Sequence, residues 1–178
     1  WRSRRRWNWK SIEGDPFSES GRTDVKWGAF IEGEDQFAPD FFGISQYEAE
    51  FMDPQHRLFL TGAWEAIWDA GHDPRALAGQ SVGVFAGVQF QDYQRLIDQR
   101  GLTSAQACTG NAHAMIANRV SFLLDVHGPS AAIDTACSSS LVAIHSAVQA
   151  IRRGECKMAV AGGVNLLLTP DMFIMGRQ

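Results

Sequence analysis

The stretch that decides the fold is Asp134-Thr-Ala-Cys137-Ser-Ser-Ser140-Leu-Val-Ala143, where two different sequence patterns meet. Residues 131–135 form a short apolar run that is typical of a strand. Apolar residues then recur at helical spacing at Leu141, Ile144, Val148 and Ile151. Gly154 supplies the stop of this helix. We therefore expect the chain to turn directly from a strand into a helix at Cys137.

Two further apolar runs predict strands on either side of this segment. Residues 81–87 are rich in β-branched side chains and bounded by glycine, which indicates a strand buried on both faces. Residues 158–162 indicate a third buried strand. The Gly162-Gly163 pair after it fits close backbone packing better than a phosphate-binding loop.

Helical patterns alternate with these strands. Ser45 and Glu48 form a capping-box pattern that starts a short helix over about 45–52. Asp53 caps a second helix, which has Pro54 at its first position and ends at Gly71. A third helix is expected over 111–124. The alternation predicts an α/β layered fold with a mixed or parallel sheet.

Residues 1–43 show little periodicity and are expected to form an irregular segment over a core. Phe37, Phe41 and Phe42 should anchor its end by being buried. The first residues alternate arginine with tryptophan, which can mark a nucleic-acid patch. We favour a solvated edge for this basic start.

Composition narrows the class of protein. The chain has 178 residues, is 45% hydrophobic and carries a net charge of −4, as expected of one globular domain without general attraction to nucleic acid or anionic membranes. No segment resembles a signal peptide or reaches the roughly 20 apolar residues of a membrane span. Three cysteines without CxxC spacing suit a reducing compartment, so we expect a cytoplasmic protein.

Cys137 is the candidate catalytic residue. The first amides of a helix are unpaired and its start is electropositive, which favours a reactive thiolate there. The same amides could donate to the oxygen of a tetrahedral intermediate, and the three serines that follow could cap the helix. The alternative is that Cys137 is a small buried hydrophobe, the role expected for Cys108 and Cys156.

No histidine in the sequence is placed to act as a base for Cys137. His145 follows it by eight positions, which corresponds to about 12 Å along a helix axis and is too far for proton transfer. Ordinary structural or surface roles are expected for the other four, which are His56, His72, His113 and His127.

Five blocks of the chain, in order, resemble the β-ketoacyl synthases, and most closely the ketosynthase domains of modular polyketide synthases. The central block is DTACSSSLVAIHSAVQAI at 134–151. The others are KWGAFIEGEDQFAPDFFGIS at 26–45, MDPQHRLFLTGAWEAIWDAG at 52–71, TGNAHAMIANRVSFLLDVHGPS at 109–130 and MAVAGGVNLLLTPDMF at 158–173. The string GNAHAMIANRVS at 110–121 and the KWGAFIEG insert look most like ketosynthases of assembly lines that are fed by free-standing acyltransferases.

This resemblance implies a thiolase-like layered fold of two similar halves. Residues 1–178 would be a partial ketosynthase domain, covering the first half only, with a mixed sheet and a central buried helix. Both ends of the chain are expected to be truncated. The family's two catalytic histidines lie in HGTGT-like and NxGH-like motifs, and no such string occurs in this sequence.

The resemblance also implies a reaction. Cys137 would accept an acyl chain from the phosphopantetheine arm of an acyl carrier protein, and the complete domain would condense it with a malonyl-carrier unit by decarboxylative Claisen chemistry. No cofactor or metal is expected on the chain itself, and a homodimer is expected. The isolated chain would be inactive in condensation without the remainder of the domain.

Two alternatives stay open at this point. One keeps the fold but makes the protein a thiolase or a coenzyme-A-dependent synthase, which the carrier-dependent pattern of residues 26–71 disfavours. The other is that the chain acts only as an inactive dimerisation or folding fragment.

Overall fold

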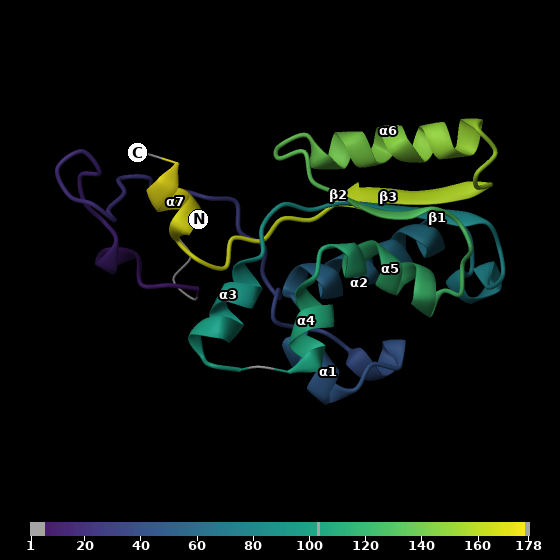
Figure 1. Ribbon diagram of the computed structural model, residues 1–178, viewed down its shortest axis with the longest axis horizontal. Helices are drawn as coiled ribbons and strands as arrows, with labels where there is room; N and C mark the ends of the chain where they lie inside the picture. Colours follow the sequence, from purple (N-terminus) through teal and green to yellow (C-terminus); the bar gives the residue numbers. More distant parts are fainter. Residues whose placement is uncertain (1–5, 103, 177–178) are drawn as a thin grey trace. The chain divides into compact units, whose positions relative to one another are not determined.

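The computed structural model describes residues 6–102 and 104–176 (Figure 1). The chain divides into two compact units, residues 35–165 and residues 1–34 together with 166–178. The larger unit contains the sheet and most helices. None of the described helices has the length and apolar character needed to cross a membrane.

A three-stranded parallel sheet forms the middle of the larger unit. Its strands are β1 (Val82–Gly87), β2 (Ser130–Ile133) and β3 (Met158–Gly163), in the order β2-β1-β3. Val84 pairs with Ser130 and Val82 with Met158. A mixed or parallel sheet was expected, and every described strand pair is parallel. Helices connect successive strands, and such crossovers return the chain in the same direction.

Helices cover both faces of this sheet (Figure 1). α2 (Pro54–Asp69) and α5 (Ala114–Leu123) lie on one face and α6 (Ser139–Arg152) on the other. β1 is buried along its whole length, as predicted. The third strand, β3, is only half-buried, contrary to expectation, because it is an edge strand.

The predicted helix starts of α1 (Gln46–Phe51) and α2 are confirmed. Ser45 Oγ accepts a hydrogen bond from the amide of Glu48 at 3.1 Å, and Asp53 Oδ1 accepts one from the amide of Gln55 at 2.8 Å. The Glu48 carboxylate pairs with Arg119 of α5. Each cap satisfies an amide that the helix leaves unpaired.

The helix predicted over 111–124 begins three residues late. The backbone at Ala112 is extended, and it separates α5 from a further helix, α4 (Ala105–Asn111). Asn111 Nδ2 donates to the Ala107 and Phe51 carbonyls at 2.7 and 2.9 Å, which holds the end of α4 in place. α3 (Asp92–Gln99) precedes α4, and neither helix was predicted from the sequence.

The face of α6 that packs against the sheet is not the one predicted from the sequence. The large residues of its predicted stripe are exposed: Leu141, Ile144, Val148 and Ile151. Ala143, Ala147 and Ala150 are buried instead and pack with Phe85 of β1. Small side chains let the helix axis come close to the strands. The expected buried helix is therefore buried on its alanine face alone.

Glycines at two strand ends allow the start of α6 to approach the sheet. A Cβ added at Gly87 would lie 2.7 Å from the Ser140 amide nitrogen, and one added at Gly163 would lie 2.7 Å from Ser140 Cβ. Gly162 has room, since the nearest atom to an added Cβ is 3.9 Å away. The predicted close packing of the Gly162-Gly163 pair is therefore confirmed for Gly163.

The smaller unit contains η1 (Trp9–Ser11) and α7 (Asp171–Met175). Trp7, Phe30 and Phe173 form an aromatic cluster, with Trp7 and Phe173 ring centroids 5.6 Å apart. Arg6 Nε donates to Glu34 at 2.9 Å, and the Arg6 side chain is only 7% exposed. The prediction of a solvated edge is therefore wrong from Arg6 onward, because these side chains pack together. Trp1 to Arg5 lie outside the described residues.

Phe41 departs from its predicted burial. It belongs to η2 (Pro39–Phe42) and is 53% exposed, whereas Phe37 and Phe42 are half-buried and stack on each other at 5.5 Å. The Phe41 ring packs edge-on against Trp64 at 5.1 Å. This contact holds it at the surface of the larger unit.

The first turn of α2 carries buried polar groups. His56 is 1% exposed, and its two ring nitrogens have no hydrogen-bond partner among the described residues. Burial, followed by the positive charge of Arg119, lowers the pKa of His56 to about 3. Burial raises the pKa of Asp53 to about 6, against the opposing hydrogen bonds from Gln55. Both groups therefore resist taking up charge in the folded protein.

His56→Leu should change the dependence of stability on pH. The unfolded chain takes up a proton at His56 below about pH 6.5 while the folded chain does not, which costs about 1.4 kcal/mol of stability per pH unit. Asp53 acts in the opposite direction between about pH 6 and 3.8, where the folded state binds the extra proton. Denaturant unfolding across this range should show His56→Leu gaining stability relative to wild type as the pH falls. The exposed His72, changed to leucine, is the control, and equal pH slopes in all three proteins would contradict the assignment.

Gly163→Ala should destabilise the protein, by about 1–3 kcal/mol, since the new methyl group would overlap Ser140. Gly162→Ala is the matched control, because the neighbouring position in the same strand has space for a Cβ. Thermal unfolding of both variants measures the difference. Equal losses would show that the start of α6 is not closely seated on the strand end.

Candidate active site at the turn from β2 to α6

The turn between β2 and α6 presents Cys137 at the protein surface. β2 ends at Ile133, α6 begins at Ser139, and Cys137 is exposed between them. The predicted strand-turn-helix at this cysteine is therefore present. Cys137 is not a buried hydrophobe, which removes the alternative structural interpretation.

The turn contains a backbone conformation that L-residues rarely adopt. Ala136, directly before Cys137, has a φ of 53°, in the left-handed region. Such a conformation costs roughly 1–2 kcal/mol for a residue with a Cβ. Asp134 Oδ1 accepts a hydrogen bond from the Ala136 amide at 3.0 Å, which supports the sharp reversal. The bend lets the chain pass from strand to helix within a few residues.

Ser139 ties the two sides of the turn together. Its side chain is buried, and Oγ accepts from the Thr135 amide at 2.9 Å while donating to the Ala136 carbonyl at 2.7 Å. Ser138 Oγ also donates to the Thr135 carbonyl, at 2.7 Å. The serines were expected to cap the helix, but these two close the turn on either side of Cys137. Sequence reasoning missed this role, for which three serines in a row are only a weak signal.

Two amides at the start of α6 are already engaged. The Ser138 amide donates to the Thr135 carbonyl at 3.3 Å, and the Ser139 amide donates to the Ala136 carbonyl at 3.1 Å. The expectation that the first amides of the helix are all free for an intermediate therefore does not apply to these two. The positive end of the helix still faces the cysteine, since α6 begins two residues after it.

The turn stands at the carboxyl edge of the sheet. Gly87 and Gly163 are the last residues of β1 and β3, and both closely approach the first turn of α6. The carboxyl ends of parallel strands are where open α/β sheets place their ligands. Sequence reasoning identified Gly163 through the Gly-Gly pair, but it missed Gly87, whose packing partner is distant in sequence.

The histidines lie in other places. His145 is exposed on α6, about two turns beyond Cys137, and His72 and His127 are exposed as well. His113 directly precedes α5, and His56 is buried in the first turn of α2. Within residues 6–102 and 104–176, no hydrogen bond joins a histidine to Cys137.

The other two cysteines differ from each other. Cys156 is 3% exposed and packs among the alanines between α6 and the sheet, as a small hydrophobe would. Cys108 is exposed on α4, so its expected buried role is wrong. Its helix is short and packs through Ala107, which leaves the next side chain pointing outward. In the described part of the chain, no group of three or more His, Cys, Asp or Glu residues could hold a metal ion.

Sequence comparison connects this site with a known family. Residues 2–178 match the family described as beta-ketoacyl synthase, N-terminal domain. The chain is 51% identical over 177 residues to the polyketide synthase PksM of Bacillus subtilis, and 47% identical over 175 residues to the pikromycin polyketide synthase component PikAII of Streptomyces venezuelae. These matches cover 95% and 96% of the chain, but only 4% and 5% of the two relatives.

Solved structures show the same fold. An oxazolomycin ketosynthase domain from Streptomyces albus superposes with a TM-score of 0.85 at 42% identity, over 96% of this chain and 30% of that one. The ketosynthase from module 6 of the bacillaene synthase of Bacillus subtilis gives a TM-score of 0.82 at 36% identity, over 96% and 27%. The thiolase-like fold expected from the sequence, of which the chain spans the first part, is confirmed. The chain therefore belongs to the β-ketoacyl synthase family of polyketide synthases and carries its N-terminal domain.

Proposed function

We propose that Cys137 is the residue that accepts the acyl chain in a polyketide ketosynthase. One observation carries the proposal: its sulfur belongs to an exposed residue on a strained turn at the start of α6 and at the carboxyl edge of the sheet. Exposure admits a thioester, and the electropositive helix start favours the thiolate that attacks it. Cys108 is also exposed, but it lies within a helix and so lacks this setting.

The proposed step is an exchange of thioesters. The Cys137 thiolate attacks the carbonyl carbon of an acyl group held on the phosphopantetheine arm of an acyl carrier protein. A carbon–sulfur bond to Cys137 forms, and the bond to the pantetheine sulfur breaks. The departing pantetheine thiolate takes up a proton from water, so the acyl group ends on the protein and the carrier is left as a free thiol.

The complete domain would then extend the chain by condensation. A malonyl unit on a carrier loses carbon dioxide, and the resulting carbanion attacks the carbonyl carbon of the acyl-Cys137 thioester. A carbon–carbon bond forms, the bond to the Cys137 sulfur breaks, and the extended chain stays on the carrier while the Cys137 thiolate is released. This step requires proton transfer and stabilisation of charge near the sulfur. The described histidines of this chain lie elsewhere in the fold, so we assign these tasks to the remainder of the ketosynthase domain.

The outer face of α6 supports a role for that remainder. Leu141 is 69% exposed, and Ile144, Val148 and Ile151 continue the same apolar stripe. An apolar stripe of this length on a helix that is already packed on its other side indicates a surface that is covered in the working protein. We assign its cover to the rest of the domain. The edge strands β2 and β3 offer backbone groups for further pairing, which is consistent with a homodimer.

Acyl transfer to the chain can be tested directly by mass. Incubation with an acyl thioester of N-acetylcysteamine should add one acyl group to the wild-type chain, because Cys137 is exposed at the start of α6. Cys137→Ala should abolish the gain, whereas Cys108→Ala, which removes the other exposed thiol, should retain it. A gain that survives Cys137→Ala would refute the assignment. The acylated chain should form no ketoacyl product with a malonyl thioester, since condensation is assigned to the complete domain.

Self-association should depend on the outer face of α6. Leu141→Gln/Ile144→Gln replaces two exposed apolar side chains and should reduce concentration-dependent light scattering of the chain, since exposed apolar surface drives association. Phe122→Gln is the control, because Phe122 is 83% exposed but lies on α5, away from this stripe. Equal effects of the two substitutions would count against a specific covered surface on α6.

A further inference from the structure

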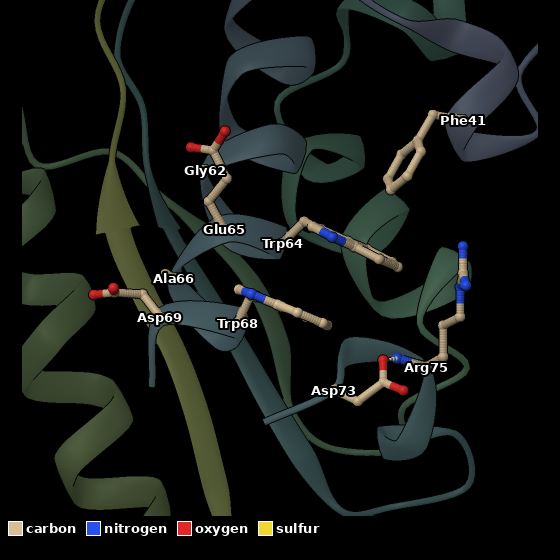
Figure 2. A pocket seen from close by; sticks show the side chains of 9 residues that line it. All are labelled: Phe41, Gly62, Trp64, Glu65, Ala66, Trp68, Asp69, Asp73 and Arg75. Atoms are coloured by element: carbon tan, nitrogen blue, oxygen red, sulfur yellow. Dashed lines mark hydrogen bonds between the residues drawn. The ribbon is translucent and has the colours of Figure 1, made fainter. Parts of the chain in front are cut away.

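A second feature of the larger unit is a cavity of about 940 Å³ beside the C-terminal half of α2. Trp64 and Trp68, one helical turn apart, extend their rings side by side from α2 (Figure 2). Phe41 and Arg75 lie across from the ends of these rings (Figure 2). The cavity is remote in sequence from Cys137, and the proposed acyl transfer does not use it.

The aromatic walls of this cavity are unusually open to solvent. Trp68 is 65% exposed and Phe41 is 53% exposed. Trp64 is partly covered by Phe41 and Phe42, whose rings pack edge-on against it at 5.1 and 6.0 Å. Among residues 6–102 and 104–176, Trp68 has no comparable ring contact. Large aromatic side chains left open in a hollow are typical of binding surfaces.

The charges around the cavity are mainly negative. Glu65, Asp69 and Asp73 contribute carboxylates, and Arg75 is the one basic residue that lines it. Figure 2 shows Glu65 and Asp69 on the flank of the tryptophans away from Phe41. The last turn of α2 contains no basic residue, and the C-terminus of a helix is itself electronegative. The surface therefore attracts cations.

Arg75 already makes a cation–π contact with one of the two tryptophans. Its guanidinium lies 5.7 Å from the centroid of the Trp64 ring, in the range of a cation–π contact. Trp68 extends in parallel from the next turn of the helix, without an equivalent cation among the described residues. Trp64 therefore already has a cation–π partner in Arg75, whereas the ring of Trp68 is available for one.

We propose that this cavity is a docking site for a polypeptide segment of a partner protein that presents an arginine or lysine between apolar side chains. The cation would lie over the exposed ring of Trp68, and the neighbouring apolar side chains would contact Trp64 and Phe41. Asp69 and Glu65 would stabilise the positive charge at longer range. An acidic segment would be repelled, because the cavity presents three carboxylates and a single guanidinium. A second copy of this chain would be repelled for the same reason if it docked through the same acidic face.

The test uses three acetylated and amidated peptides of matched length: Leu-Arg-Leu-Arg-Leu, Leu-Gln-Leu-Gln-Leu and Leu-Glu-Leu-Glu-Leu. Binding to the chain is followed by NMR through the indole N–H signal of Trp68, which is assigned with Trp68→Phe. The arginine peptide should cause a saturable shift and bind about fivefold more tightly than the glutamine peptide, with the glutamate peptide weakest. Added salt should reduce the preference for arginine.

Variants distinguish binding at this site from nonspecific binding elsewhere on the surface. Trp68→Ala, followed through Trp64, should weaken binding of the arginine peptide about fivefold, and Glu65→Gln/Asp69→Asn should remove most of its preference over the glutamine peptide. Phe122→Ala, at an even more exposed ring on α5, should leave binding unchanged. The proposal fails if the three peptides bind alike, if none causes a saturable shift, or if Phe122→Ala matches Trp68→Ala. None of these outcomes depends on acylation of Cys137.

Discussion

The close contact between the first turn of α6 and the ends of β1 and β3 is the constraint on which the candidate active site depends. Gly87 and Gly163 leave no Cβ between the strand ends and Ser140. The helix start can therefore sit directly over the edge of the sheet. The turn that carries Cys137 then has few residues in which to reverse, and the left-handed backbone at Ala136 is the result. Ser139 holds this geometry with hydrogen bonds to Thr135 and Ala136.

Much of this fold could be predicted because its signals are local. The caps at Ser45 and Asp53 act within one helical turn, so their sequence patterns predict the bonds that the structure contains. The apolar run of β1 predicted a buried strand for the same reason. The position of Cys137 between strand and helix followed from a change of period at one point in the chain.

Other features could not be predicted because they depend on distant residues. The helical period of α6 identifies which residues share a face, but α6 has two apolar faces. The alanine face packs against the sheet, because its small side chains permit a closer approach. Ala136 carries no sign of its left-handed backbone, which Gly87, Gly163 and Ser139 impose from outside. Phe41 resembles a core residue in sequence, yet it packs against the outer side of the half-buried Trp64 ring and stays 53% exposed. The break at Ala112 depends on contacts between Asn111 and α1.

The parallel sheet has a consequence for the order of folding. β1 pairs with β2 and β3, and each partner follows it by a long stretch of chain that must first be synthesised and folded into crossover helices. Pairing of segments so distant in sequence is slow, since the entropy of closing the loop is lost before the contacts form. The close contact of α6 with the sheet needs both Gly87 and Gly163 in place, so the turn at Cys137 can reach its final geometry only after β3 has been synthesised and paired with β1. The nascent chain would thus acquire its thiol geometry only after this long-range pairing.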